Sequence, residues 1–190
     1  MLLVPSPGSR PRAHAAWSLL PLLLAALLLF ACGEAKRPDG GVGLLPVGSA
    51  APEVVGYDVA GAEVRLSALA GKKKAVVYFY PKDASPGCTT EACAFRDAWD
   101  HYTAAGVVVI GVSTDSKESH QEFLAKKKLP FALASDEAMT VGPAYGVPKR
   151  VWGYSRVSFL VGTDGKVAKV WPDVDPGVHA DDVLKAAAGL

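Results

Sequence analysis

The stretch Tyr78–Asp97 reads YFYPKDASPGCTTEACAFRD and sets the expected fold of this chain of 190 residues. An aromatic, apolar run ends at Pro81, and a turn rich in proline, glycine and serine follows it. Cys88 stands where a helix is expected to begin, and Cys93 comes five residues later. Two of the three cysteines therefore fall within six positions of a strand-to-helix junction, where the sequence predicts a reactive thiol.

The segments on either side of this stretch predict an α/β domain. Continuous β-branched and aromatic runs predict strands buried on both faces at 75–80, 107–113 and 157–161, and 167–171 is expected to pair back after a tight turn. A helical turn is predicted at 66–69, and helices from residue 89 or 90 to 105, from 116 onward, at 140–145 and at 178–188. An N-terminal β-hairpin is predicted from 54–59 and 63–65. This order predicts a mixed central sheet and resembles the thioredoxin-like fold.

The first 32 residues have the pattern of an export signal. Arg10 and Arg12 precede the leucine-rich run Trp17–Phe30, and a basic segment before an apolar one of roughly 7–15 residues is typical of a signal peptide. The sequence Leu29-Phe-Ala-Cys32 resembles a bacterial lipobox, which implies cleavage before Cys32 and its lipidation. An ordinary signal peptide cut elsewhere, or an uncleaved anchor, remains open at this point.

Charge and composition describe the rest of the chain. The first 32 residues hold two of the 20 basic residues and none of the 19 acidic ones, so the remainder has 18 and 19, a net charge of −1. This balance gives no electrostatic reason to expect nucleic acid as a partner. We expect residues 33–43, which are polar and glycine-rich, to form a flexible linker, and 44–190 to form one domain. A domain of this size buries a core without disulfides, which favours a chemical role for the cysteines.

The position of Cys88 favours its reactive form. A thiol reacts as the thiolate, and a free cysteine has a pKa near ~8.5. In the first turn of a helix, unpaired backbone N–H groups and the positive end of the helix dipole stabilise an anion. Gly87 lets the backbone approach closely, and the Ser85 hydroxyl is placed to donate to the sulfur or to an oxygen beside it.

Cys93 is too far from Cys88 to form a disulfide within an intact helix. Five residues of ideal helix separate the two Cα atoms by about 8.7 Å, whereas a disulfide tolerates at most ~6.8 Å. The pair therefore meets only if the first turns unwind. Two unrelated cysteines, one of them a small core residue, are the simpler alternative. A zinc site is poorly supported, because four intervening residues are not the usual ligand spacing.

The segment Pro81-Lys-Asp-Ala-Ser-Pro-Gly-Cys88 resembles the peroxiredoxin motif Pro-x-x-x-Thr/Ser-x-x-Cys. The second cysteine five residues on is similar to the bacterioferritin comigratory protein (PrxQ) subfamily. The resemblance runs from about residue 45 to the C-terminus and includes Gly111-Val-Ser-Thr-Asp115. It also includes Ser155-Arg-Val-Ser-Phe-Leu-Val161, where Arg156 occupies the position of the family's active-site arginine.

The resemblance implies reduction of hydrogen peroxide and organic hydroperoxides. Cys88 would attack the O–O bond and become a sulfenic acid, and Cys93 would then condense with it after local unfolding. Ser85 and Arg156 would bind the peroxide oxygens. Pro81 would shield the sulfur, and Glu91 would orient Arg156. A thioredoxin-like dithiol would reduce the disulfide, the protein would act as a monomer, and no metal, haem or flavin is implied.

Two other functions remain open from the sequence alone. An exported thioredoxin-like thiol-disulfide oxidoreductase or copper-delivery lipoprotein would also carry paired cysteines, although such proteins favour Cys-x-x-Cys or Cys-x-x-x-Cys. A non-catalytic binding lipoprotein that keeps the fold is the third possibility. His101, His120 and His179 are expected on polar helix faces, and Trp99, Trp152 and Trp171 are expected to pack in the core or at its rim.

Overall fold

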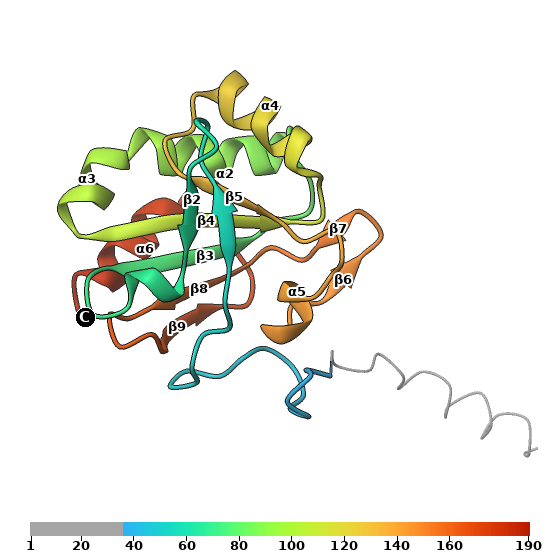
Figure 1. Ribbon diagram of the computed structural model, residues 1–190. Coiled ribbons are helices and arrows are strands. Elements are labelled where there is room, and N and C mark those ends of the chain that lie inside the picture. Colours follow the sequence, from blue (N-terminus) through green and yellow to red (C-terminus); the bar gives the residue numbers. More distant parts are fainter. Residues whose placement is uncertain (1–35) are drawn as a thin grey trace, which may run out of the picture. The chain divides into compact units, whose positions relative to one another are not determined.

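The computed structural model describes residues 36–190, which form a seven-stranded mixed sheet with helices packed on it (Figure 1). The predicted signal peptide 1–32 and Cys32 lie outside the described residues. The sheet runs in the order β2-β1-β5-β4-β3-β8-β9. Its strands are β1 (Val55–Tyr57), β2 (Glu63–Arg65), β3 (Lys74–Phe79), β4 (Val107–Ser113), β5 (Ala132–Ser135), β8 (Val157–Val161) and β9 (Val167–Trp171).

Strand pairing confirms the predicted mixed sheet. Strand β3 pairs in parallel with β4, and β4 with β5, whereas β8 lies antiparallel to β3 and β9 antiparallel to β8. The predicted N-terminal hairpin is also present, because β1 and β2 pair antiparallel and extend the sheet beside β5. The parallel centre places the ends of β3 and β4 at one edge, and the turn that leads to Cys88 leaves from this edge.

Strand β3 divides the core into two layers, because alternate residues of a strand face opposite sides. Val76 and Tyr78 belong to one hydrophobic cluster, to which four helices contribute: α2 (Pro86–Asp97), α3 (Trp99–Ala104), α4 (Lys117–Lys127) and α6 (His179–Ala187). Val77 and Phe79 belong to the cluster on the opposite face. The prediction that this run is buried on both faces is therefore confirmed.

The helix after β3 differs from the prediction at both ends. Helix α2 (Pro86–Asp97) begins three residues before Thr89, since proline is well accommodated in the first turn, where its missing N–H is not needed. The helix does not continue to Ala105. Ala98 separates α2 from α3 (Trp99–Ala104), in which the Tyr102 hydroxyl donates to the Ala180 carbonyl at 2.7 Å.

The remaining helices follow the sequence more closely. Helix α4 (Lys117–Lys127) has Ser116 as its N-cap, with the side chain accepting from the Ser119 N–H. The short helices η2 (Ser67–Leu69) and α5 (Val141–Ala144) and the C-terminal helix α6 (His179–Ala187) lie where the sequence predicts them. Among the described residues, none of the helices has the length and apolar character needed to cross a membrane.

Two of the three histidines expected on polar helix faces are instead buried. His120 in α4 and His179 in α6 are each 2% exposed. Burial lowers the pKa of His179 to about 4, so its ring is neutral at pH 7 and hydrogen-bonds the Ser158 hydroxyl at 2.8 Å. The prediction is wrong for these two positions because only the packing of the helices shows which side each histidine faces.

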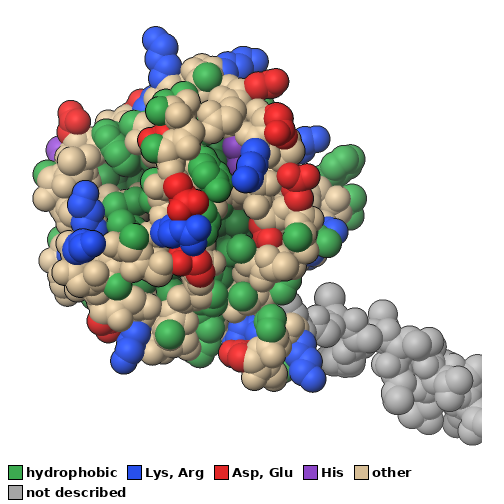
Figure 2. All heavy atoms as spheres, viewed as in Figure 1, with side chains coloured by type: hydrophobic (Ala, Val, Ile, Leu, Met, Phe, Trp, Pro, Cys, Tyr) green, Lys and Arg blue, Asp and Glu red, His purple; other side chains and the backbone are tan. Residues whose placement is uncertain are grey.

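Strand β5 and the two-stranded hairpin β6 (Lys149–Arg150) and β7 (Gly153–Tyr154) were not predicted. Trp99 and Trp171 pack against the core as expected. Trp152 does not, because it projects from the turn between β6 and β7 and is 74% exposed. Elsewhere the surface is mixed, and Figure 2 shows charged side chains of both signs interspersed with hydrophobic ones on one face.

The described part of the predicted linker forms a small closed loop. A bridge joins Lys36 to Val42, and the Arg37 guanidinium donates to the Gly43 carbonyl at 2.9 Å. The domain boundary at residue 44 stays a prediction. Both hydrophobic clusters lie within residues 45–187, so the part of the chain from residue 34 onward carries its own core.

Candidate active site

The candidate nucleophile, Cys88, is the third residue of α2 and is 2% exposed. It therefore lies in the first turn of the helix, as predicted, where backbone N–H groups have no partner within the helix. The turn before it holds Ala84 at φ 56°, in the left-handed region. Ser85 is the N-cap residue, with extended backbone, and its side chain makes no capping hydrogen bond.

Arg156 joins Cys88 to Glu91. It lies one residue before β8, and its Nη2 donates to the Cys88 sulfur at 3.3 Å, while its Nη1 pairs with Glu91 Oε2. Space is tight at Gly87, because an added Cβ would lie 3.2 Å from Arg156 Nη2 and the guanidinium would have to shift slightly. The structure thus brings together three of the residues singled out from the sequence. Cys88 and Glu91 lie on α2, and Arg156 follows them in the chain by 68 and 65 residues. The guanidinium stabilises negative charge on the sulfur.

Glu91 is fully buried, and only one of its oxygens has a partner. Its Oε1 makes no hydrogen bond in the described structure. Burial raises the pKa of the Glu91 carboxyl to about 7, although the Arg156 charge acts in the opposite direction. The Glu91 carboxyl therefore changes charge near neutral pH. The Arg156 guanidinium donates to both the carboxylate and the Cys88 sulfur.

Replacement of Glu91 by Gln is expected to alter the pH dependence of stability. The folded-state pKa of about 7 lies above the ordinary value of 4.5, so the wild type should lose stability as pH rises through this window. The loss is roughly 3 kcal/mol in the free energy of unfolding, at about 1.4 kcal/mol per pKa unit. Glu91→Gln should remove it, measured by urea unfolding at pH 5 and pH 8.

The exposed Glu122 provides a matched control for this experiment, and Glu122→Gln should follow the wild type. If Glu91→Gln also kept the wild-type difference between pH 5 and pH 8, the carboxyl would not titrate near neutrality.

Ser85 and Pro81 lie near the site, and in the described structure neither makes a hydrogen bond to the Cys88 sulfur. The Ser85 hydroxyl donates to the Lys82 carbonyl at 3.0 Å, so in this structure it closes the turn rather than binding Cys88. Pro81 lines a cavity of about 660 Å³ together with Arg156. Other residues of the cavity wall are mainly apolar, among them Leu44, Pro148, Trp152, Tyr154, Val157 and Pro172. The cavity has room for a substrate much larger than hydrogen peroxide.

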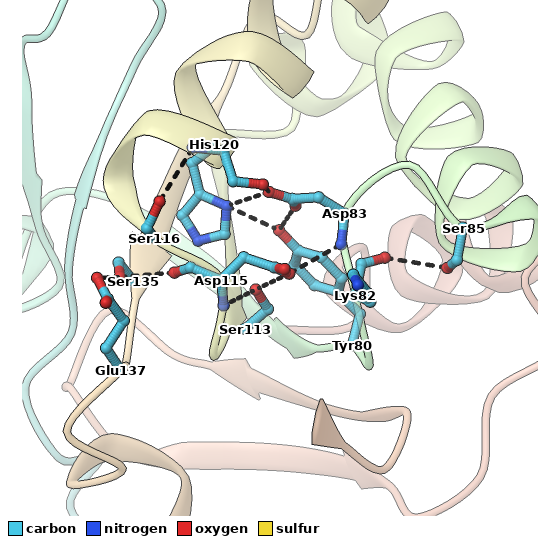
Figure 3. A network of polar contacts seen from close by, with 11 residues as sticks. Tyr80, Lys82, Asp83, Ser85, Ser113, Asp115, Ser116, His120, Ser135 and Glu137 are labelled. Atoms are coloured by element: carbon cyan, nitrogen blue, oxygen red, sulfur yellow. Dashed lines mark hydrogen bonds and ion pairs between the residues drawn. The ribbon is translucent and has the colours of Figure 1, made fainter. Parts of the chain in front are cut away.

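A buried polar network that the sequence did not predict holds the turn before α2 (Figure 3). Asp83 accepts hydrogen bonds from the hydroxyls of Tyr80 and Ser119, both at 2.7 Å, and contacts His120 Nδ1 at 2.8 Å. Its backbone N–H donates to Asp115 Oδ2 at 2.8 Å. Burial acts to raise the pKa of Asp83, but the His120 contacts and the hydroxyl donors outweigh it, and the pKa is lowered. The network fixes the loop between β3 and α2.

The sequence held a partial signal for this network, because both carboxylates lie in motifs noted above. Asp83 is inside the segment 81–88, and Asp115 ends the segment 111–115. The sequence did not indicate that His120 of α4 contacts Asp83. Among residues 36–190, no group of three or more His, Cys, Asp or Glu side chains is arranged to hold a metal ion.

Cys93 is on the same helix as Cys88, and neither is in a disulfide. Because both residues are helical, the ideal-helix separation of about 8.7 Å applies to them. Cys93 is partly exposed, whereas Cys88 is buried. The two sulfurs therefore belong to one element yet cannot bond while it is intact.

The comparisons with known proteins agree with this geometry. Residues 47–170 match the AhpC/TSA family. The chain belongs to the AhpC/TSA family. This AhpC/TSA protein is 46% identical over 119 residues to the putative peroxiredoxin bcp of Coxiella burnetii, covering 59% of this chain and 79% of that one. It is 42% identical over 146 residues to the chloroplastic peroxiredoxin Q of Sedum lineare, and the match covers 75% of this chain and 78% of that one.

Solved structures confirm the thioredoxin-like peroxiredoxin fold. Peroxiredoxin Q of Xanthomonas campestris is similar at a TM-score of 0.68 and 34% identity, covering 77% of this chain and 97% of that one. The peroxidoxin BcpB of Mycobacterium tuberculosis gives a TM-score of 0.70 at 29% identity, covering 77% and 98%. This AhpC/TSA protein therefore groups with the peroxiredoxin Q and bcp proteins.

Proposed function

We propose that this protein reduces hydrogen peroxide and organic hydroperoxides with electrons from thiols, and that Cys88 is the nucleophile. The observation that carries the proposal is the contact between Arg156 Nη2 and the Cys88 sulfur at 3.3 Å, beside a cavity that Arg156 lines. Relatives named peroxiredoxin support it. A solved structure of the Xanthomonas campestris protein, similar at 34% identity, is described in terms of its alkyl peroxide reduction activity.

The first step transfers oxygen to the sulfur. The Cys88 thiolate attacks the terminal oxygen of ROOH, the O–O bond breaks, and the alkoxide takes a proton and leaves as ROH. Cys88 becomes a sulfenic acid. Arg156 stabilises the charge as it moves from sulfur to the departing oxygen, because its donors are fixed in place before the reaction. We place Ser85 and Pro81 beside the bound peroxide, as the family motif implies.

The second step requires the start of α2 to unwind. The helix end lacks a side-chain cap, which is worth about 1 kcal/mol, and Gly87 in its first turn costs a similar amount relative to alanine. The pair between Glu91 and Arg156 ties this end of the helix to the residue before β8. Oxidation removes the negative charge that Arg156 stabilises on the sulfur, so one contact that holds the first turn is weakened.

After unwinding, Cys93 attacks the Cys88 sulfenic acid. A disulfide forms and water leaves. A thioredoxin-like dithiol then exchanges with the disulfide and restores both thiols. Cys93 is thus a resolving residue, and α2 cycles between a folded and a locally unfolded state.

The Cys93→Ser variant tests this assignment. It should consume about one equivalent of peroxide as fast as the wild type, because the first step does not use Cys93. Mass spectrometry should then find Cys88 carrying added oxygen, and turnover with a protein dithiol should fall by about tenfold or more, since the exchange has no disulfide to attack.

Ala94→Ser, one position along the same helix, is the matched control and should behave as the wild type. Full dithiol-supported turnover by Cys93→Ser, without accumulation of oxidised Cys88, would show that another group resolves the intermediate.

We further propose that the protein is exported and anchored by lipid at Cys32. The support is the sequence alone: the apolar run 17–30 followed by Leu29-Phe-Ala-Cys32. Expressed in bacteria, the chain should be found in the membrane fraction with its N-terminus at a diacylglyceryl-modified Cys32. Cys32→Ala should release the protein from the membrane fraction or leave its leader uncleaved. A soluble wild-type protein whose N-terminus is at another residue would contradict the lipid anchor.

We also propose that the catalytic unit is a monomer, because Cys88, Arg156 and Cys93 all come from one chain. Light scattering of the part from residue 34 onward should give the mass of a single chain at every concentration over a hundredfold range. A dimer that persists on dilution would contradict this.

A further inference from the structure

The turn between β6 and β7 carries the two most exposed large hydrophobic side chains of the described residues. Val151 is 88% exposed and Trp152 is 74% exposed. Figure 2 shows hydrophobic side chains projecting at the edge of the molecule where Figure 1 places this hairpin. Exposing two adjacent side chains of this kind costs solvation energy, and such patches commonly mark an interaction site. We call residues 149–152 the hairpin tip.

Positive charge accompanies this apolar pair. Lys149 and Arg150 precede it on the hairpin and are exposed. Lys82, also exposed, lines a surface hollow together with Lys149, Val151 and Trp152. The carboxylate of Asp115 lies in the same hollow but is already hydrogen-bonded to the Ser113 hydroxyl and the Asp83 N–H. Three cationic side chains, Lys82, Lys149 and Arg150, against this one carboxylate leave a net positive charge around the tip.

The hairpin is seated firmly against the active-site loop. Gly153 has φ 114°, and a Cβ there would lie 2.0 Å from the Pro81 carbonyl oxygen, so its backbone packs directly on the proline. The Tyr154 hydroxyl donates to Asp136 Oδ2 at 2.6 Å, and Arg150 Nε donates to the Ser155 hydroxyl at 2.9 Å. A partner bound at the tip is consequently held beside Pro81 and the cavity of Arg156.

The same hairpin forms part of that cavity. Arg150, Trp152 and Tyr154 line the space of about 660 Å³ that Pro81 and Arg156 also line. Its wall is mainly apolar, with the exposed carboxylate of Asp173 on one side. Trp152 and Arg156 thus line one cavity, which offers an acyl chain a mainly apolar surface beside the guanidinium.

We propose that the hairpin tip rests on an anionic phospholipid surface and that the cavity receives the hydroperoxide of an acyl chain. Tryptophan favours the interface between headgroups and acyl chains, and lysine and arginine are attracted to anionic lipid. The apolar run 17–30 and Cys32 in the sequence predict a chain held at a membrane, and one weak contact combined with a second anchor gives stable attachment. This inference rests on the proposed peroxidase function.

The Val151→Asp variant tests the proposal in the part of the chain from residue 34 onward, which carries its own core. Its rate is measured on phospholipid hydroperoxide in phosphatidylglycerol vesicles and on hydrogen peroxide in solution, with dithiothreitol as reductant in both. Turnover of hydrogen peroxide with a protein dithiol is measured in parallel. Vesicle binding is measured by sedimentation at high lipid concentration. The matched control is Val59→Asp, at an exposed valine in the turn between β1 and β2.

Val151→Asp should lower vesicle binding and the rate on vesicle hydroperoxide by about fivefold or more, since a single charge near an anionic surface changes binding by about that factor. Its rate on hydrogen peroxide should be unchanged, and Val59→Asp should match the wild type in every assay. The wild type should also bind phosphatidylcholine vesicles less than phosphatidylglycerol ones.

Two results would overturn the proposal. In one, Val151→Asp binds vesicles and reduces their hydroperoxide as the wild type does. In the other, the variant keeps vesicle binding but turns over more slowly with a protein dithiol, which would assign the tip to the reductant protein. Failure of the proposed function itself gives a different pattern, because the wild type would then leave hydrogen peroxide unreduced.

Discussion

Cys88→Ser is expected to abolish peroxide consumption, with kcat/KM falling by about 10³-fold or more. Serine keeps nearly the same shape in the buried first turn of α2, but its hydroxyl does not ionise near neutral pH. The Arg156 contact and the helix N–H groups then have no anion to stabilise. Consumption of hydrogen peroxide by the purified chain, followed with dithiothreitol in excess, measures the effect.

Cys93→Ser is the control for this variant, because it replaces a cysteine of the same helix and should keep the first turnover. Circular dichroism should show that Cys88→Ser retains its helices. Peroxide consumption by Cys88→Ser at even a tenth of the wild-type rate would assign the nucleophile elsewhere.

Arg156→Met is expected to lower kcat/KM by about 10²- to 10³-fold, the usual cost of removing one fixed donor to a developing negative charge. The same change leaves Glu91 buried without its partner, and breaking a buried pair in this way costs about 3–5 kcal/mol of stability. Protonation of Glu91 should reduce this loss at low pH, because burial already raises the pKa of Glu91 to about 7.

The double variant Arg156→Met/Glu91→Gln separates catalysis from stability. Removing both charges should restore most of the lost unfolding free energy, since no uncompensated carboxylate remains. The rate should stay low, because the donor to the sulfur is still absent. Recovery of both stability and rate in the double variant would show that Arg156 acts only through folding.

The sequence predicted the fold and the site best where the residues of a single segment are enough to identify it. The run that became β3 is apolar throughout because both faces are covered, and the motif 81–88 locates the loop, the helix start and the nucleophile together. Arg156 could be placed only through family resemblance, since no local pattern shows that a residue 68 positions away reaches Cys88.

The missed features depend on long-range packing. Strand β5 is short and was overlooked because its neighbour β4 lies about twenty residues earlier in the chain. His120 is predicted on a polar helix face, but it is buried and contacts Asp83 of the loop before α2. The predicted role of Ser85, donation to the sulfur or to an oxygen beside it, stays a prediction, and in this structure its hydroxyl donates to the Lys82 carbonyl.

The central claim is that Cys88 and Cys93 bond only after α2 unwinds, and peptide mapping of the oxidised chain tests it most directly. The reduced chain is treated with one equivalent of hydrogen peroxide, blocked with iodoacetamide and digested. A peptide joining Cys88 to Cys93, about two mass units lighter than the reduced form, is the predicted product. Recovery of alkylated Cys93 beside an oxygenated Cys88 in the wild type would contradict the account.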